Sequence, residues 1–207
     1  MKGLKAIVFD LDGVIFDSLE ANIALYDHIL SALGRKPAAR LHAQEIHRLT
    51  LEESLRLLLE GDEQLVKQGM EYWRGMDPSP FIEMLRLNPG ADQALNHLKE
   101  RFVLGVGTNR TYTARPSLAH FGLDGLFKTI VTPLEVGEGK PSPMFMERIL
   151  AELGVGSHEA VYVGDSVVDE QLCRASGVRL VAFGNPELEA WAHVKGFKEL
   201  VELVDGE

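Results

Sequence analysis

Two aspartates separated by one residue, Asp10 and Asp12, directly follow a short apolar run, and Gly13 comes after them. Residues 6–9 are continuously apolar, which predicts a buried strand. Side chains two residues apart in an extended chain point the same way, so both carboxylates can converge at the carboxyl end of this strand. Carboxylates this close repel each other unless a cation that prefers oxygen ligands, such as Mg²⁺, lies between them. One carboxylate could then act as a nucleophile while the other transfers protons.

The tetrapeptide alone is a weak signal, because Asp-x-Asp-Gly also occurs in surface turns and at the start of calcium-binding loops. A calcium loop is disfavoured because Phe16 stands where such a loop requires an oxygen ligand, and no helix is predicted before Asp10. The choice between a turn and a reactive site therefore depends on the rest of the chain.

Four further polar residues lie at or near the ends of predicted strands: Thr108, Lys140, Asp165 and Asp169. Each has an ordinary alternative explanation, such as a helix cap, a solvated loop cation, a turn, or an acidic residue in a first helical turn. Together, however, they map to the same edge of one sheet as the aspartate pair. The combined set offers a nucleophile, a proton donor, a hydroxyl and an ammonium for phosphate oxygens, and acidic oxygens for a metal. These are the groups that phosphoryl transfer requires.

Alternating strands and helices are predicted to position these residues. Five apolar runs predict strands, at residues 6–9, 102–107, 128–131, 160–163 and 178–182. Amphipathic patterns predict helices between them, at about 91–100, 112–121, 142–153 and 167–176. The alternation predicts an α/β fold with a doubly wound, mostly parallel sheet of about five strands and helices on both faces.

The segment 18–80 shows helical patterns only, including a capping box that begins at Thr50, and it ends in a proline-rich turn. We therefore expect two domains: a Rossmann-like core formed by residues 1–17 and 81–207, and an all-helical cap formed by residues 18–80. Because the cap leaves the core just beyond the first strand, it is expected to lie over the ligand-binding end of the sheet.

Composition narrows the class of protein. The 207 residues are 45% apolar and 25% charged, as in ordinary globular proteins, and no apolar run approaches the length of a membrane span. The net charge of −10, without a basic stripe, argues against nucleic-acid binding. The single cysteine and the strand close to the N-terminus, which leaves no room for a signal peptide, predict a cytoplasmic protein.

Four motifs in order carry a resemblance to the haloacid dehalogenase superfamily, over about residues 4–185 and in the subgroup with a helical cap. The chain is most similar there to phosphoglycolate phosphatase and β-phosphoglucomutase relatives. The matching stretches are residues 10–18 for the first motif, Thr108-Asn109 for the second, residues 139–143 for the third and residues 164–169 for the fourth. Asp12 argues against a dehalogenase, because that branch needs no proton donor for its leaving group.

The resemblance implies a role for each motif residue. Asp10 would attack phosphorus and form an aspartyl-phosphate, and Asp12 would protonate the leaving oxygen and then activate water. Thr108 would bind a phosphate oxygen, and Lys140 would neutralise charge on Asp10 and on the transferring group. The implied Mg²⁺ ligands are Asp10, the main-chain carbonyl of Asp12, Asp165 and, in support, Asp169.

The predicted function is Mg²⁺-dependent hydrolysis of a small phosphate monoester, resembling phosphoglycolate or a sugar phosphate. Candidates for contact with this metabolite are Gly13, Arg48, Asn109 and Arg110. A solvated position is the alternative for Arg48, and an exposed loop cation is the alternative for Arg110. The sequence leaves open a phosphomutase, and less readily a phospho-accepting regulatory protein without turnover, although such a switch requires neither a cap nor a proton donor like Asp12.

Overall fold

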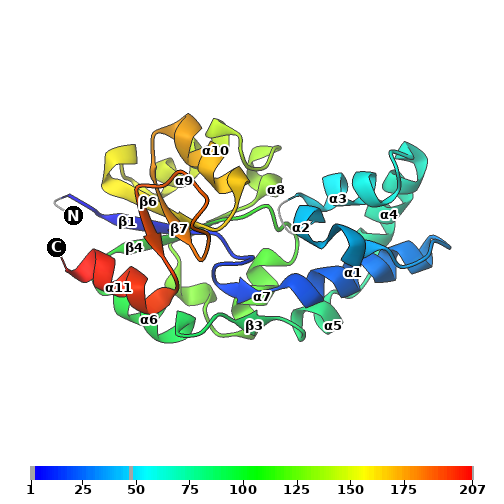
Figure 1. Ribbon diagram of the computed structural model, residues 1–207, viewed down its shortest axis with the longest axis horizontal. Coiled ribbons are helices and arrows are strands. Elements are labelled where there is room, and N and C mark those ends of the chain that lie inside the picture. Colours follow the sequence, from blue (N-terminus) through cyan, green and yellow to red (C-terminus); the bar gives the residue numbers. More distant parts are fainter. Residues whose placement is uncertain (1–2, 47–48, 207) are drawn as a thin grey trace. The chain divides into compact units, whose positions relative to one another are not determined.

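The chain folds into two compact units, seen in a computed structural model that describes residues 3–46 and 49–206. The first unit contains Met1–Asp17 and Leu87–Glu207, and the second contains Ser18–Arg86 (Figure 1). The chain thus leaves the first unit once and returns to it once. Among the helices of the described residues, none has the length and apolar character needed to cross a membrane.

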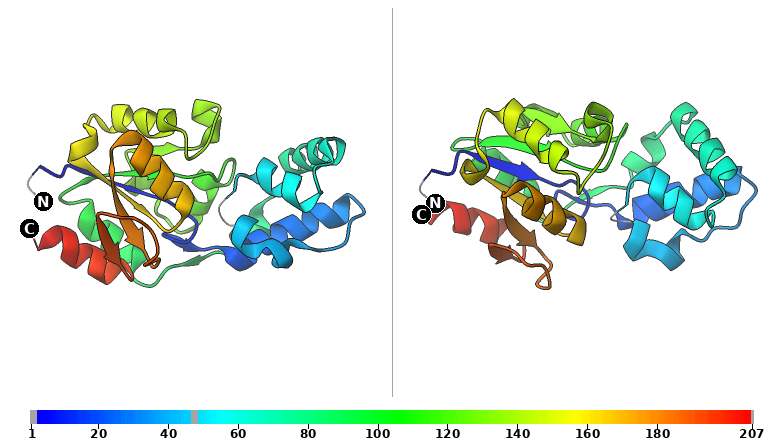
Figure 2. Two further views of the ribbon diagram at one scale, coloured as in Figure 1. Left: turned by 45° about the horizontal axis from the view of Figure 1, so that its top comes forward. Right: turned by 90° about the horizontal axis from the view of Figure 1, so that it is seen from above.

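A six-stranded parallel sheet forms the centre of the first unit (Figures 1 and 2). The strands lie in the spatial order β5 (Thr129–Val131), β4 (Val103–Gly107), β1 (Ala6–Phe9), β6 (Ala160–Gly164), β7 (Arg179–Phe183) and β8 (Ala192–Val194). The doubly wound α/β fold is confirmed, and five strands lie where the apolar runs predicted them. The edge strand β8 was missed, because its three residues include one buried side chain, Val194, which is too little pattern to indicate a strand.

The register of the central strands brings their carboxyl ends level with one another. Phe9, the last residue of β1, pairs with Val106 of β4 on one side and with Val163 of β6 on the other. The residues that follow these three strands therefore emerge at one edge of the sheet. For this reason the motifs that follow β1, β4 and β6 can meet at that edge.

Helices cover both faces of the sheet, because alternate residues of each strand point to opposite sides. Val8 of β1 belongs to an apolar cluster with Phe145 and Ile149, whereas the ring of the adjacent Phe9 stacks on Phe197 with their centroids 6.4 Å apart. The covering helices are α6 (Ala91–Leu98), α7 (Ala114–His120), α8 (Pro133–Val136), α9 (Pro143–Leu153), α10 (Val167–Ser176) and α11 (Phe197–Asp205). In Figure 1, α9 and α10 lie on one face and α6 and α11 on the other.

The second unit is helical and has its own apolar core, which includes Ile29, Leu55 and Trp73. The predicted capping box at Thr50 is present: its hydroxyl accepts from the Glu53 N–H, and the Glu53 carboxylate accepts from the Thr50 N–H. The helices are α1 (Leu19–Ala32), the 3-10 helix η1 (Ala39–His42), α2 (Ala43–Ile46), α3 (Leu51–Leu58), α4 (Glu63–Gly75) and α5 (Ser79–Ile82).

The two chain crossings between the units lie side by side as a short two-stranded sheet of β2 (Phe16–Asp17) and β3 (Arg86–Leu87). The sequence placed residues 81–86 in the core, whereas the compact division places them in the helical unit. The reason is that the proline-rich turn does not end the insertion: it opens α5, which packs against α1.

Candidate active site

Asp10 lies at the point where β1 ends, and its carboxylate is held on both oxygens. Its main-chain N–H continues the sheet by donating to Val163. Oδ1 accepts the N–H of Leu11 at 2.7 Å, and Oδ2 lies 2.7 Å from the ammonium nitrogen of Lys140. The side chain is buried. The carboxylate is therefore fixed at the carboxyl edge of the sheet, facing one cation.

Lys140 is buried too, so it is not the solvated loop cation that its sequence context alone would allow. Its Nζ lies 2.7 Å from Oδ2 of Asp10, 2.7 Å from Oδ1 of Asp169 and 3.0 Å from the hydroxyl of Tyr162. Burial alone would lower the pKa of Lys140, but the carboxylates of Asp10 and Asp169 outweigh burial and raise it above its usual value. The lysine is accordingly charged throughout the physiological range.

The loop that carries Lys140 is positioned by Asn109, from the loop after β4. The Asn109 amide oxygen accepts the main-chain N–H of Lys140 at 2.8 Å. Gly139 allows this contact, because a Cβ at that position would overlap the Asn109 amide. Asn109 was predicted to contact substrate, and in the structure it also holds the lysine loop.

Asp165 and Asp169 come from the loop after β6 and the first turn of α10. Oδ2 of Asp169 accepts the N–H groups of Asp165 and Ser166 at 3.2 and 3.1 Å and the Ser166 hydroxyl at 2.7 Å. Its other oxygen contacts Lys140. Gly164 permits this tight arrangement, because a Cβ there would overlap the Asp169 side chain. Asp169 thus shapes the loop and holds the lysine.

Three carboxylates share this small volume: one oxygen each from Asp10, Asp165 and Asp169 lies within 4.8 Å of the others. Burial, together with the neighbouring carboxylates, raises the pKa of Asp10 to about 7 although the Lys140 ammonium acts in the opposite direction. Burial and the charge of Asp169 raise the pKa of Asp165 to about 7 as well. With every carboxylate ionised, the three acids and one ammonium would carry a net charge of about −2. This is the electrostatic setting that a divalent cation stabilises.

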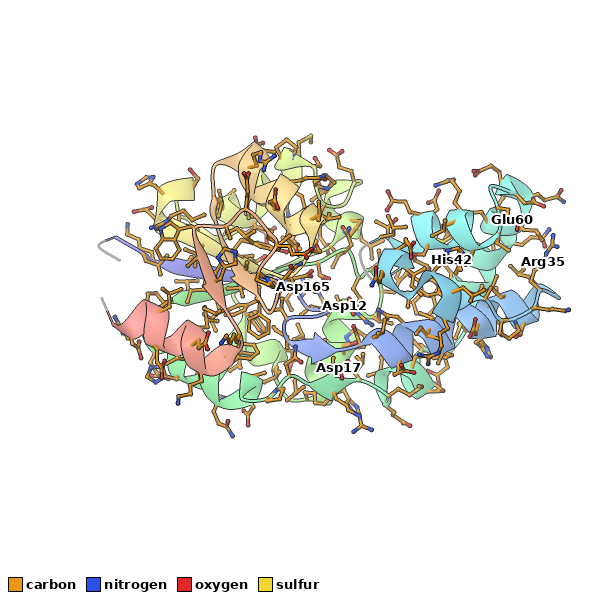
Figure 3. The ribbon with its side chains drawn as sticks, in the orientation of Figure 1. Asp12, Asp17, Arg35, His42, Glu60 and Asp165 are labelled. Atoms are coloured by element: carbon orange, nitrogen blue, oxygen red, sulfur yellow. The ribbon has the colours of Figure 1, made fainter. Side chains whose placement is uncertain are left out.

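Asp12 forms a two-point ion pair with Arg110. Nε of Arg110 lies 3.1 Å from Oδ2 and its terminal nitrogen lies 2.5 Å from Oδ1 of Asp12. Asp12 and Asp165 are labelled in Figure 3, and their proximity is reflected in the contribution of the Asp12 charge to the raised pKa of Asp165. Gly13 follows Asp12 with a left-handed φ of 78°, and a Cβ at this position would overlap the Asp165 carboxylate.

Thr108, the remaining predicted catalytic residue, is buried directly after β4. Its hydroxyl oxygen accepts the main-chain N–H of Arg110 at 3.1 Å, and its own main-chain N–H donates to Val131 in β5. The hydroxyl is therefore oriented at the same sheet edge as Asp10.

The structure brings nearly all predicted site residues together in the first unit: Asp10, Asp12, Gly13, Thr108, Asn109, Arg110, Lys140, Asp165 and Asp169. Arg48, the predicted contact from the helical insertion, lies outside the described residues.

Three polar residues that the sequence reasoning did not single out also support the site. The hydroxyl of Tyr162 accepts from Lys140 and donates to the carbonyl of Gly107 at 2.6 Å. Asn88 binds the carbonyl oxygens of residues 13 and 14, and Asn185 binds that of Asp165. A signal existed for Tyr162, since it is a polar aromatic residue within an otherwise apolar strand, but the two asparagines occupy unremarkable loop positions.

Known proteins resemble this chain in sequence and in fold. A crystal structure of a HAD-superfamily hydrolase of subfamily IA, variant 1, from Geobacter sulfurreducens is 32% identical with a TM-score of 0.84, covering 97% of this chain and 99% of that one. A phosphorylated carbohydrates phosphatase of Thermotoga maritima is 26% identical over 184 residues, which cover 86% of this chain and 84% of the relative. A phosphoglycolate phosphatase of Pseudomonas savastanoi is 28% identical over 188 residues, covering 86% and 68%.

The family model described as haloacid dehalogenase-like hydrolase matches residues 7–183, a range that begins within β1 and ends with β7. The match therefore includes the sheet edge on which Asp10, Thr108, Lys140 and Asp165 meet. With a parallel six-stranded sheet, a helical insertion after β1 and a family match across most of its length, this chain belongs to the haloacid dehalogenase-like hydrolase family.

Proposed function

We propose that this protein is a Mg²⁺-dependent phosphatase that hydrolyses a small phosphate monoester through an aspartyl-phosphate on Asp10. The observation that carries the proposal is the placement of the Asp10 carboxylate, which is buried at the end of β1, 2.7 Å from Lys140 and within an acidic cluster. A carboxylate in such a position can attack phosphorus while an ammonium and a metal offset the charge.

The donor set fits a magnesium ion. Asp10 and Asp165 offer carboxylate oxygens in the same small volume, and hard oxygen ligands are those that Mg²⁺ prefers. We assign these two residues and the main-chain carbonyl of Asp12 as the metal-holding groups. Asp169 supports them from nearby, because both of its oxygens already accept bonds from Lys140 and from the loop. When bound, the ion would neutralise charge on the phosphoryl group and on the attacking carboxylate.

In the first step, the Asp10 carboxylate oxygen forms a bond to phosphorus as the bond to the ester oxygen breaks, and Asp12 gives that oxygen a proton. In the second step, a water oxygen attacks the aspartyl-phosphate and Asp12 takes the water proton. The Asp10 carboxylate is thereby restored and inorganic phosphate is released. The Thr108 hydroxyl donates a hydrogen bond to a phosphate oxygen, and Lys140 offsets negative charge during both transfers.

The relatives support a small phosphorylated metabolite as the substrate, because one is named for phosphorylated carbohydrates and the other for phosphoglycolate. Discrimination among such esters depends on groups remote from the phosphate, so the substrate is proposed as a class.

The test is a phosphate-release panel with glycolate, hexose, glycerol, nucleotide and pyrophosphate esters, measured with and without Mg²⁺. Asp10→Asn should lower turnover by more than about a thousandfold, because a covalent nucleophile has no substitute. The exposed Asp92→Asn on α6 is the matched control and should keep full activity. Substantial turnover by Asp10→Asn would show that Asp10 serves the metal alone, and turnover that does not depend on Mg²⁺ would contradict the assigned metal site.

A further inference from the structure

The two-point ion pair between Arg110 and Asp12 is largely withdrawn from solvent. The side chains are 9% and 15% exposed, and each carboxylate oxygen accepts a different guanidinium nitrogen. Such fork-to-fork pairs fix the orientation of both partners as well as adding energy. The proton-transferring carboxylate is therefore held in one position by the catalytic unit itself.

Arg110 is in turn anchored by its own loop. A terminal guanidinium nitrogen donates to the Thr113 hydroxyl at 3.2 Å, and the main-chain N–H donates to the Thr108 hydroxyl at 3.1 Å. Both threonines are buried. Nε and both terminal nitrogens of Arg110 thus each donate a hydrogen bond within the protein.

We propose that Arg110 is a positioning residue that acts through Asp12 and serves the hydrolysis of the aspartyl-phosphate. The inference rests on the proposed function. A carboxylate that accepts two guanidinium bonds is an acceptor on both oxygens, which is the form that can take a proton from water. Protonation of Asp12 removes the negative charge with which Arg110 pairs, so the pair is strongest in the ionised form that accepts the water proton. Arg110 therefore favours the second step and does not assist the first.

The step that Arg110 assists is the hydrolysis of the aspartyl-phosphate by water. The water oxygen forms a bond to phosphorus, the bond between phosphorus and the Asp10 oxygen breaks, and one water proton passes to the Asp12 carboxylate. Inorganic phosphate leaves, and Asp10 is restored. Arg110 exchanges no atoms, since it only holds the carboxylate that accepts the proton.

The experiment resolves the two steps by rapid quench with p-nitrophenyl phosphate and Mg²⁺, following both nitrophenol release and acid-trapped phosphoenzyme. In Arg110→Gln, the rate constant for phosphoenzyme hydrolysis should fall about tenfold or more, because a positioned general base contributes about 10²–10⁴. The rate constant for phosphoenzyme formation, and with it kcat/KM, should change less than about threefold. Once hydrolysis limits turnover, kcat and KM should fall together and a burst approaching one equivalent should appear.

A direct role in substrate binding predicts the opposite pattern, and it would overturn the proposal: KM would rise and kcat/KM would fall without a burst. In an Asp12→Asn background, Arg110→Gln should leave phosphoenzyme hydrolysis unchanged, and a further loss there would also refute action through Asp12. Arg148→Gln, on the exposed face of α9, is the control arginine.

A second variant keeps the test decisive if Arg110→Gln does not fold. Thr113→Val removes one anchor of the guanidinium and should give the same selective slowing of hydrolysis with a smaller size. The same measurements distinguish failure of the phosphatase function from failure of the role of Arg110. A wild type that never turns over the ester refutes the phosphatase, whereas turnover with equal slowing of both steps refutes only the role of Arg110.

Discussion

Mg²⁺ and protons should compete for the carboxylates of Asp10 and Asp165. The pH dependence of the apparent Kd for Mg²⁺ follows from the pKa values of these two groups. Burial and the surrounding carboxylates raise the pKa of Asp10 and of Asp165 to about 7. Below that pH, each carboxyl group holds a proton in the metal-free folded protein. Because a metal requires the ionised ligands, binding must release those protons.

The magnitude can be worked out for two sites that titrate near pH 7. Between pH 6 and pH 5, each protonated ligand weakens the apparent affinity about tenfold, so the apparent Kd for Mg²⁺ should rise about a hundredfold, or about 2.7 kcal/mol. Above pH 8 both groups are ionised, and the apparent Kd should become nearly constant. At pH 6, close to two protons should leave for each ion bound.

Isothermal titration calorimetry of the metal-free protein with MgCl₂ measures both quantities, if each pH is run in two buffers that differ in ionisation enthalpy. Asp165→Asn should release about one proton at pH 6 and reduce the pH dependence to about tenfold per unit, whereas Asp92→Asn should match the wild type. An apparent Kd that stays constant from pH 5.5 to 8, with no proton released, would show that the ion binds elsewhere or that both carboxyl groups are already ionised.

Three further outcomes follow from the same contacts. Since the folded-state pKa values of Asp10 and Asp165 lie above the unfolded value of 3.8, the metal-free protein should lose about 7 kcal/mol of stability as pH rises from about 4 to 7, and Mg²⁺ should restore it in urea unfolding. Tyr162→Phe deletes the hydroxyl between Lys140 and a main-chain carbonyl, and should lower the free energy of unfolding by about 1–3 kcal/mol. Gly13→Ala should weaken calorimetric Mg²⁺ binding at least tenfold by displacing the Asp165 carboxylate, and wild-type affinity would contradict that geometry.

The strands could be predicted because each buried strand is a continuous apolar run, and the polar residue that follows the run lies at the edge of the sheet. A buried strand must be continuously apolar, so the first polar residue after it marks the edge of the sheet. This rule placed Asp10, Thr108 and Asp165 correctly at one edge, because parallel strands in register end together. It failed for β8, which lies at the edge of the sheet and has a single buried residue.

Side-chain partnerships were less predictable than positions. The sequence places Arg110 and Asn109 beside Thr108, but which groups they reach depends on the path of the loop before α7. In the structure one side chain turns to Asp12 and the other to the main chain of Lys140. A contact made by a main-chain N–H leaves no trace in the residue type at the donating position, so the sequence could not reveal the contact between Lys140 and Asn109.

The charged residues of the site form two groups: the Arg110–Asp12 ion pair, and Lys140 with the carboxylates of Asp10, Asp165 and Asp169. Arg110 offsets the charge of Asp12 through two bonds, although the Asp12 carboxylate still contributes to the raised pKa of Asp165. Lys140 offsets one of the three carboxylates around it, which leaves the excess negative charge on the side where Asp10 and Asp165 meet. Because an arginine cannot lose its proton in proteins, the first pair stays balanced at any pH at which Asp12 is ionised. The acidic cluster of Asp10, Asp165 and Asp169, by contrast, is stabilised only when it binds protons or a cation. Proton transfer by Asp12 and metal binding by the cluster therefore depend on different charge pairs at the same edge of the sheet.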